Sequence, residues 1–256
     1  VPKTAMELPE RNQTQLIEAH YGYQESNSLR GRLYVLPIDV KQIRAAVVDQ
    51  DPIPSEVPLD TPASIVLERT LLQRLLEASC LLDLTIVREA IDMIKQVHQG
   101  QLRKSGEPFY THPLNVATIL LTMTQDPDTV LAALLHDVVE GTPISLEQLA
   151  YQYGKKVAWL VQKVTNLDPS GKKTKLTEVE THEQLAASLD ECAVMIKLAD
   201  RLHNVRTLRF HKLAKQHLIA QETLDFYLPL ADSLNGKGVQ TVVEELRTTC
   251  EEILGL

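Results

Sequence analysis

The strongest constraint on the fold is the helical periodicity of residues 63–256. Apolar residues recur there at steps of three and four positions, as at Leu67, Leu71 and Leu75, and this spacing places them on one face of an α-helix. Aromatic residues make up only 4% of the chain, whereas Leu, Ala, Val and Glu are abundant, which favours helices over sheet. We therefore predict an all-α protein in which 63–256 forms one helical domain.

The same periodicity gives the expected bounds of the helices. Polar segments rich in turn formers separate them, most clearly 100–112 and 168–180, and Gly141-Thr142-Pro143 is expected to end the fourth helix, which Asp128 or Thr129 would cap. The predicted helices are 63–82, 85–99, 114–123, 128–140, 145–152, 155–166, 182–208, 213–234 and 237–253.

The first 62 residues have a different texture. Pro52, Pro54 and Pro58 fall within seven residues, a density that excludes helix and favours an extended linker. We predict that 1–62 is an N-terminal extension of mixed or irregular structure that ends in this Pro-rich linker. We assign it no chemistry and interpret it as a tether or a small regulatory segment.

Composition excludes several classes of protein. A net charge of −8 argues against a general nucleic-acid binder, which carries a basic surface. Cys80, Cys192 and Cys250 are far apart and form no CxxC pair, as expected for free thiols in a reducing compartment. No apolar run approaches the ~20 residues that span a bilayer. We expect a cytoplasmic protein that binds neither nucleic acid nor membrane, and the sequence leaves a homo-oligomer open.

Four residues with ionisable or metal-ligating side chains lie where apolar ones are expected. His136 and Asp137 interrupt an apolar helix, Asp200 lies in another, and His112 precedes Pro113, which should keep it out of helical geometry at a helix start. A buried carboxylate needs a cation, and Arg201 lies on another face of its helix, so a metal or a cation from another helix is expected beside Asp200. Two imidazoles and two carboxylates suit Mn²⁺, Fe²⁺ or Zn²⁺.

Further polar residues surround this set. Asn204 and Thr207 share a helical face with Asp200, and Glu140, four residues after His136, is placed to act as a general acid or base. The loop 100–112 gathers two cations and a hydroxyl, Arg103, Lys104 and Ser105, a combination that can hold phosphate. The lysines of 168–180 form either a solvated loop or a lid that touches phosphates.

Four segments resemble one known family. Arg103–Leu114, Leu135–Glu140, Val194–Asn204 and Glu222–Ala231 are similar to the hydrolase domain of RelA/SpoT-type alarmone enzymes, which belong to the HD superfamily of metal-dependent phosphohydrolases. The resemblance extends over residues 84–235 and implies an HD-domain helical bundle.

The resemblance also implies a reaction and a role for each site residue. The reaction is hydrolysis of the 3′-pyrophosphate of ppGpp or pppGpp, the nucleotides of the stringent response, to GDP or GTP and pyrophosphate, with Mn²⁺ or another divalent transition metal. Long enzymes of this family continue into a synthetase domain, whereas the given sequence ends after the hydrolase region, so we expect a stand-alone hydrolase. The implied roles are metal binding for His112, His136, Asp137 and Asp200, contact with the nucleotide for Arg103, Lys104, Ser105, Asn204 and Thr207, and catalysis for Glu140 and Asn204.

One position departs from the family pattern. An aspartate follows the acid at Glu140 in the family, whereas this chain has Gly141. Three interpretations stay open at this point. The chain is an active hydrolase, or a catalytically weakened alarmone-binding or regulatory module, or a phosphohydrolase of another nucleotide such as NADPH.

Overall fold

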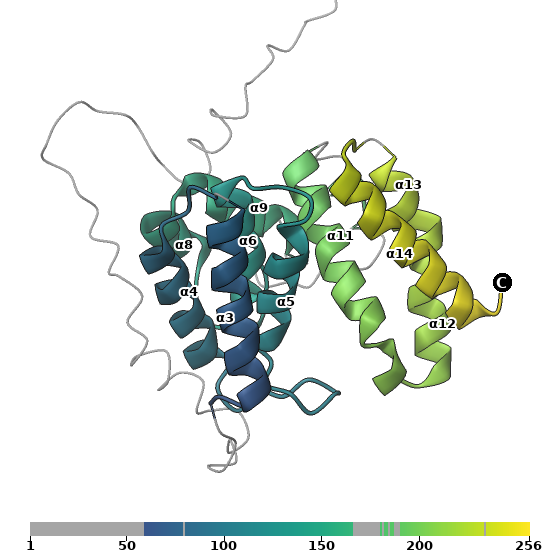
Figure 1. Ribbon diagram of the computed structural model, residues 1–256, viewed down its shortest axis with the longest axis horizontal. Helices are drawn as coiled ribbons and strands as arrows, with labels where there is room; N and C mark the ends of the chain where they lie inside the picture. Colours follow the sequence, from purple (N-terminus) through teal and green to yellow (C-terminus); the bar gives the residue numbers. More distant parts are fainter. Residues whose placement is uncertain are drawn as a thin grey trace, which may run out of the picture. The chain divides into compact units, whose positions relative to one another are not determined.

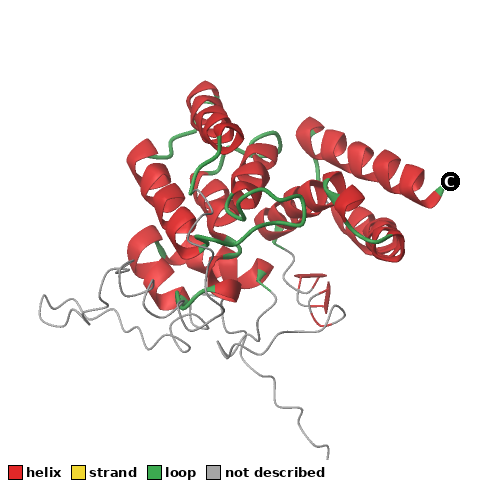
Figure 2. Cartoon of the chain, turned by 90° about the horizontal axis from the view of Figure 1, so that it is seen from below, coloured by secondary structure: helices red, strands yellow, loops and turns green. Residues whose placement is uncertain are grey.

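The computed structural model describes residues 59–78, 80–165, 180, 182–183, 185–186, 190–232 and 234–256. In these ranges every regular element is a helix, drawn in red in Figure 2, and the predicted all-α fold is confirmed. The extension 1–62 lies almost entirely outside the described residues, as does the loop 168–180, so the domain boundary near residue 62 stays a proposal. None of the described helices is both long and apolar enough to cross a membrane.

The helices keep the order that the sequence predicts, and most begin and end within a few residues of the expected positions. The α-helices are α3 (Pro62–Glu77), α4 (Leu84–Val97), α5 (Thr111–Leu120), α6 (Pro127–Leu135), α7 (Val138–Gly141), α8 (Leu146–Tyr153), α9 (Lys155–Val164), α11 (Glu191–Arg206), α12 (Leu213–Glu222), α13 (Leu228–Ala231) and α14 (Lys237–Leu254). A 3₁₀ turn, η1 (Leu208–Phe210), and a π-helical turn, η2 (Thr223–Tyr227), flank α12.

Helices α5 and α11 lie at the centre of the described helices and contact most of the others. Helix α5 packs against α3, α6 and α11, and α11 also contacts α9, α13 and α14 (Figure 1). Eight of the ten residues of α5 are buried, as expected for a helix with neighbours on all sides. The polar residues of α5 and α11 are therefore held in fixed positions by the core around them.

His112 lies inside α5, and the expectation that Pro113 would exclude it from the helix was wrong. The backbone amides of Thr111 and His112 donate to the carbonyl oxygens of Pro108 and Phe109, at 3.1 and 3.0 Å. This tight turn starts the helix before the proline, whose own nitrogen needs no partner in the first turn.

The predicted helix 128–140 is broken at His136 and Asp137. Helix α6 ends at Leu135, α7 begins at Val138, and Asp137 between them has φ −90° and ψ −9°. Two hydroxyls accommodate the break, since Thr165 Oγ1 donates to His136 O at 3.4 Å and Thr142 Oγ1 donates to Val138 O at 2.6 Å. The sequence predicts that Glu140 and His136 share one face of a continuous helix, and the break shows that they do not.

Other helix ends also differ from the expected ones. Asp126, and not Asp128 or Thr129, caps α6 by accepting from Thr129 N, because Pro127 occupies the first helical position. Helix α3 ends five residues before the predicted position, at Glu77. Helix α11 begins only after Asp190, whose extended backbone (φ −94°, ψ 112°) and side chain cap it. The predicted helix 213–234 is interrupted by η2.

Gly238 marks a close contact between two backbones, the first turn of α14 and the segment after α5. A Cβ atom at Gly238 would overlap the carbonyl oxygen of Thr122 and lie 2.6 Å from its carbonyl carbon. Replacing Gly238 with alanine is therefore expected to lower the free energy of unfolding by about 1–3 kcal/mol, because one backbone must move. Urea unfolding measures this change. Gln240→Ala, at an exposed position of α14, is the control and should stay within about 0.5 kcal/mol of the parent.

Candidate metal centre

Two histidines and two aspartates meet where the α6–α7 break faces α5 and α11. Among the described residues, His112, His136 and Asp137 each offer a ligand atom, and these atoms lie within 4.8 Å of one another. Asp200 completes the set from α11, with its Oδ1 at 3.1 Å from His112 Nε2 and 4.0 Å from His136 Nε2. The break explains how His136 and Asp137 both reach this point, since consecutive residues of a regular helix project about 100° apart.

The hydrogen bonding of His136 prepares it as a ligand. Its Nδ1 lies 2.8 Å from the carbonyl oxygen of Ala133, which can only accept, so the proton of the neutral ring is on Nδ1. Its Nε2 is buried and makes no hydrogen bond with any residue that the structure describes, although Asp137 Oδ1 lies 3.2 Å away. A bare, buried nitrogen directed at carboxylates fits a bound divalent cation.

The two carboxylates are held in their charged form. Burial acts to raise the pKa of Asp137, but His136 and His112 outweigh it and bring the pKa below the ordinary value. Burial acts in the same direction on Asp200, and there the charge of Lys197 and the contact with His112 hold the pKa well below the usual range. Burial lowers the pKa of His112 despite the two aspartates, which favours its neutral, ligating form.

The cation beside Asp200 comes from its own helix. Lys197 Nζ lies 3.2 Å from Asp200 Oδ2, one turn earlier on α11, and the two side chains are only 10% and 14% exposed. The expectation of a metal or a cation from another helix beside Asp200 did not include Lys197, which aliphatic residues surround in the chain. Lys197 binds Oδ2, whereas Oδ1 is the oxygen that faces the histidines.

Three of the five predicted nucleotide-contacting residues form a hydrogen-bonded row that begins at the same carboxylate. Asn204 Nδ2 donates to Asp200 Oδ1 at 2.7 Å, and Arg103 Nη2 donates to Asn204 Oδ1 at 3.2 Å and to Thr207 Oγ1 at 3.4 Å. The shared face of α11 that the sequence predicts is thus present. A row of polar groups runs from Asp200 to the guanidinium of Arg103, which comes from the loop before α5.

The loop itself is a tight hairpin. Leu102 and Pro108 form an isolated antiparallel bridge, and Gly106 takes φ +87°, a conformation that favours glycine. Two of the loop residues that are predicted to bind phosphate contact other side chains. Lys104 Nζ lies 3.5 Å from His211 Nδ1, whereas Ser105 Oγ donates to Glu107 Oε1 at 2.7 Å.

Glu140 is the third residue of α7 and is half-buried. It is close enough to Lys197 to affect its protonation. Burial acts to lower the pKa of Lys197, but the charges of Asp200 and, to a smaller extent, Glu140 raise it. Gly141 is the last residue of α7.

Two buried histidines near the set were not predicted. His203 Nδ1 lies 2.7 Å from His112 Nδ1, and burial, with His112 and Arg103 next to it, lowers the pKa of His203 to about 2. His98 Nδ1 lies 3.0 Å from Gln101 Oε1, while its Nε2 is buried without a hydrogen bond to the described residues. Both follow apolar residues in the chain, and only their tertiary neighbours distinguish them from core histidines.

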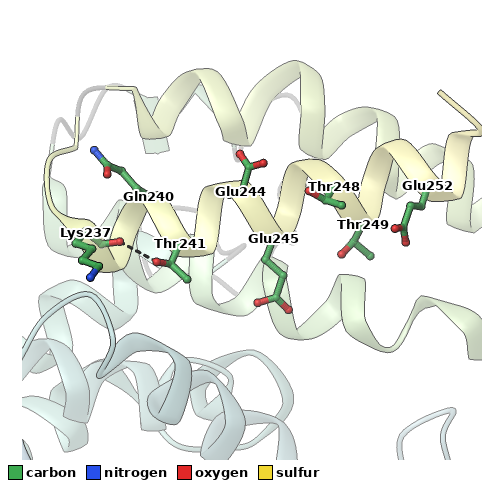
Figure 3. Close-up of a pocket in the computed structure, with 8 residues that line it drawn as sticks. All are labelled: Lys237, Gln240, Thr241, Glu244, Glu245, Thr248, Thr249 and Glu252. Carbon is green, nitrogen blue, oxygen red and sulfur yellow. Dashed lines mark hydrogen bonds between the residues drawn. The ribbon is translucent and has the colours of Figure 1, made fainter.

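A separate hollow follows one face of α14 (Figure 3). Carboxylates, hydroxyls, one amide and the ammonium group of Lys237 line it, without an imidazole or a thiol. Glu245 is paired with Arg206 at 2.6 Å. This hollow contains none of the histidine, aspartate or arginine residues that the sequence predicts for the site. The lining residues are Lys237, Gln240, Thr241, Glu244, Glu245, Thr248, Thr249 and Glu252.

One family model matches the part of the chain that contains the candidate site. The family model described as "HD domain" matches residues 90–236, the range that contains all four candidate ligands, Arg103 and α11. The chain is 42% identical over 170 residues to the GTP pyrophosphokinase of Myxococcus xanthus, a match that covers 64% of this chain and 22% of the relative. It is also 42% identical over 163 residues to the bifunctional (p)ppGpp synthase/hydrolase SpoT of Escherichia coli K12, covering 62% and 23%.

The matched part is thus about a fifth of each curated relative. Among solved structures, a chain described as a metazoan ortholog of SpoT that hydrolyzes ppGpp and plays a role in starvation responses is 28% identical, with a TM-score of 0.49. The similarity covers 66% of this chain and 94% of that chain.

Proposed function

The chain belongs to the HD-domain family, and from this premise we propose that it hydrolyses the 3′-pyrophosphate of ppGpp and pppGpp, releasing GDP or GTP and pyrophosphate. His112, His136, Asp137 and Asp200 would hold one divalent metal ion, with Mn²⁺ as the first candidate. The metal would supply Lewis acidity at the phosphorus centre and lower the pKa of water.

The observation that carries the proposal is the bare, buried Nε2 of His136 among the other three ligand atoms. A synthetase transfers pyrophosphate to a hydroxyl, whereas a His-Asp set with open positions suits the addition of water. The relatives include proteins named guanosine-3′,5′-bis(diphosphate) 3′-pyrophosphohydrolase, at 42% identity over 163 residues in E. coli O157:H7, which supports the same substrate class.

The nucleotide would lie along the row from Asp200 to Arg103. The planar guanidinium of Arg103 can stack on guanine, and it is held in place by Asn204 and Thr207. Lys104 is available to a phosphate, since a neutral imidazole is the partner nearest to it. For Ser105 to contact the nucleotide, its hydroxyl would have to leave Glu107. Glu140 and Asn204 would orient the reacting groups beside Asp200.

Gly141 supports a second candidate function, an alarmone-binding module with weakened catalysis. The family pattern places a second acid next to Glu140, and this chain lacks it. General acid–base groups contribute about 10²–10⁴-fold to a rate, so the loss of one acid of a pair slows turnover without abolishing metal or nucleotide binding. We propose that the chain retains slow hydrolysis through Glu140.

The test is pyrophosphate release from ppGpp by the purified protein with Mn²⁺, with GDP identified as the second product. Release that stops on addition of a chelator supports the hydrolase. Tight binding of ppGpp without any product favours the binding module. Release of inorganic phosphate from NADPH, with no pyrophosphate released from ppGpp, would contradict the substrate assignment.

The variant Gly141→Asp tests whether the missing acid at position 141 limits the rate of hydrolysis. We expect the variant to raise kcat for ppGpp by at least about 10-fold, because the added carboxylate helps to order or activate water. Gln152→Asp, at an exposed position in the last turn of α8, is the control and should keep the parental kcat. A Gly141→Asp rate equal to that of the parent would contradict a catalytic role for this position.

A further inference from the structure

A buried pair of imidazoles joins α5 to α11 on the side of His112 away from the carboxylates. His112 Nδ1 and His203 Nδ1 are 2.7 Å apart, and the ring centroids are 4.9 Å apart. The two residues are 3% and 6% exposed, so water cannot take the place of either partner. Two nitrogens at this distance share a single proton, and its position decides what the opposite nitrogen of His112 can do.

The two placements of that proton have opposite consequences. When His112 Nδ1 carries it and donates to His203, Nε2 of His112 keeps a free lone pair toward Asp137 and Asp200. When His203 Nδ1 carries it and donates to His112, the neutral ring of His112 has its own proton on Nε2. That proton then points at Asp200 Oδ1, 3.1 Å away, and blocks ligation.

The other histidine of the set has no such freedom. His136 Nδ1 faces a backbone carbonyl oxygen, which cannot donate, so its tautomer is fixed with or without a metal. His112 faces an imidazole, which can donate or accept. Of these two histidines, His112 is therefore the one whose tautomer is selected by a neighbouring side chain.

We propose that His203 is a positioning residue for the metal centre: it accepts the hydrogen bond of His112 Nδ1 and so keeps His112 Nε2 free to bind the metal. This inference rests on the metal site of the proposed function. Each ring carries one proton in both arrangements. When His112 donates to His203, the protons are on His112 Nδ1 and His203 Nε2. When His203 donates to His112, they are on His203 Nδ1 and His112 Nε2.

Two variants of His203 distinguish its role as a hydrogen-bond acceptor from its role in packing. In His203→Asn, the amide oxygen lies near the former Nδ1 position and can still accept. In His203→Leu, the volume is retained but no acceptor is present. We expect His203→Leu to bind Mn²⁺ about 10–100-fold more weakly than the parent, and His203→Asn to stay within about threefold. His217→Leu, at an exposed position of α12, is the matched control.

Binding is measured from the signal of free Mn²⁺ in electron paramagnetic resonance, and thermal unfolding of the metal-free proteins reports folding. Equal Mn²⁺ affinity of His203→Leu and the parent would overturn the inference and leave the proposed function standing. An Asn variant as weak as the Leu variant would also overturn it. Failure of the parent to bind Mn²⁺ would remove the metal site, and the inference with it.

The unaltered chain gives an independent spectroscopic test that does not depend on a variant folding. In ¹⁵N-labelled protein loaded with diamagnetic Zn²⁺, long-range ¹H–¹⁵N correlations report which ring nitrogen carries the proton. We expect a protonated Nδ1 for His112 and an unprotonated Nδ1 for His203, with the His203 signals assigned by their loss in His203→Asn. The reverse assignment in the Zn²⁺-loaded protein would overturn the inference.

Discussion

Replacing Asp200 with alanine is expected to destabilise the metal-free protein by about 3–5 kcal/mol and to abolish Mn²⁺ binding. The loss of stability follows from Lys197, whose buried charge is left without the carboxylate 3.2 Å away. The loss of binding follows from removal of the oxygen that faces both histidines. Urea unfolding gives the first effect, and isothermal titration with Mn²⁺ gives the second.

The double variant Asp200→Ala with Lys197→Met tests the cause. A buried ion pair replaced by apolar side chains of similar volume is often neutral for stability, so the double variant should regain most of the lost free energy of unfolding. It should remain unable to bind Mn²⁺, because the ligand is still missing. If the single variant were as stable as the parent, or the double variant no more stable than the single one, the assigned role of Lys197 would be wrong.

Replacing Glu140 with glutamine is expected to lower kcat for ppGpp by about 10²–10⁴-fold. The substitution keeps the size of the side chain and removes its charge and its capacity to accept a proton. Because Glu140 is not among the four ligand residues, Mn²⁺ affinity should change little. The measurement is pyrophosphate release at saturating Mn²⁺ and ppGpp, together with a Mn²⁺ titration of the same preparation.

Glu147→Gln is the matched control, since Glu147 is an exposed residue of α8 a short distance along the chain. It should keep the parental kcat. An unchanged kcat in Glu140→Gln would show that another group handles the proton. A parallel loss of Mn²⁺ affinity would instead place Glu140 among the residues that hold the metal.

The sequence predicts the helices and the four candidate ligands for the same reason. Apolar periodicity reveals the buried faces, and His136, Asp137 and Asp200 stand out because they interrupt such faces. Their convergence in space required the fold, since α11 lies far along the chain from α5 and α6. The roles of these residues remain proposals.

What the sequence did not predict depends on tertiary partners. Lys197 is the one polar residue of the aliphatic segment 194–199, and only the distance to Asp200 identifies it as the buried counter-ion. His203 gains its meaning from His112 on another helix. The break at His136 and Asp137 cannot be predicted from the sequence, because the surrounding apolar residues would suit a continuous helix. The hydroxyls of Thr142 and Thr165 that accommodate the break come from later segments of the chain.

The central claim is that His112, His136, Asp137 and Asp200 form a single metal centre. Crystals grown with Mn²⁺ and measured at the manganese absorption edge test it most directly. We predict one strong anomalous peak within coordination distance of His112 Nε2, His136 Nε2 and the carboxylate oxygens of Asp137 and Asp200. The absence of a peak at this point in a crystal grown with saturating Mn²⁺, or a peak only on the carboxylates of α14, would contradict the account.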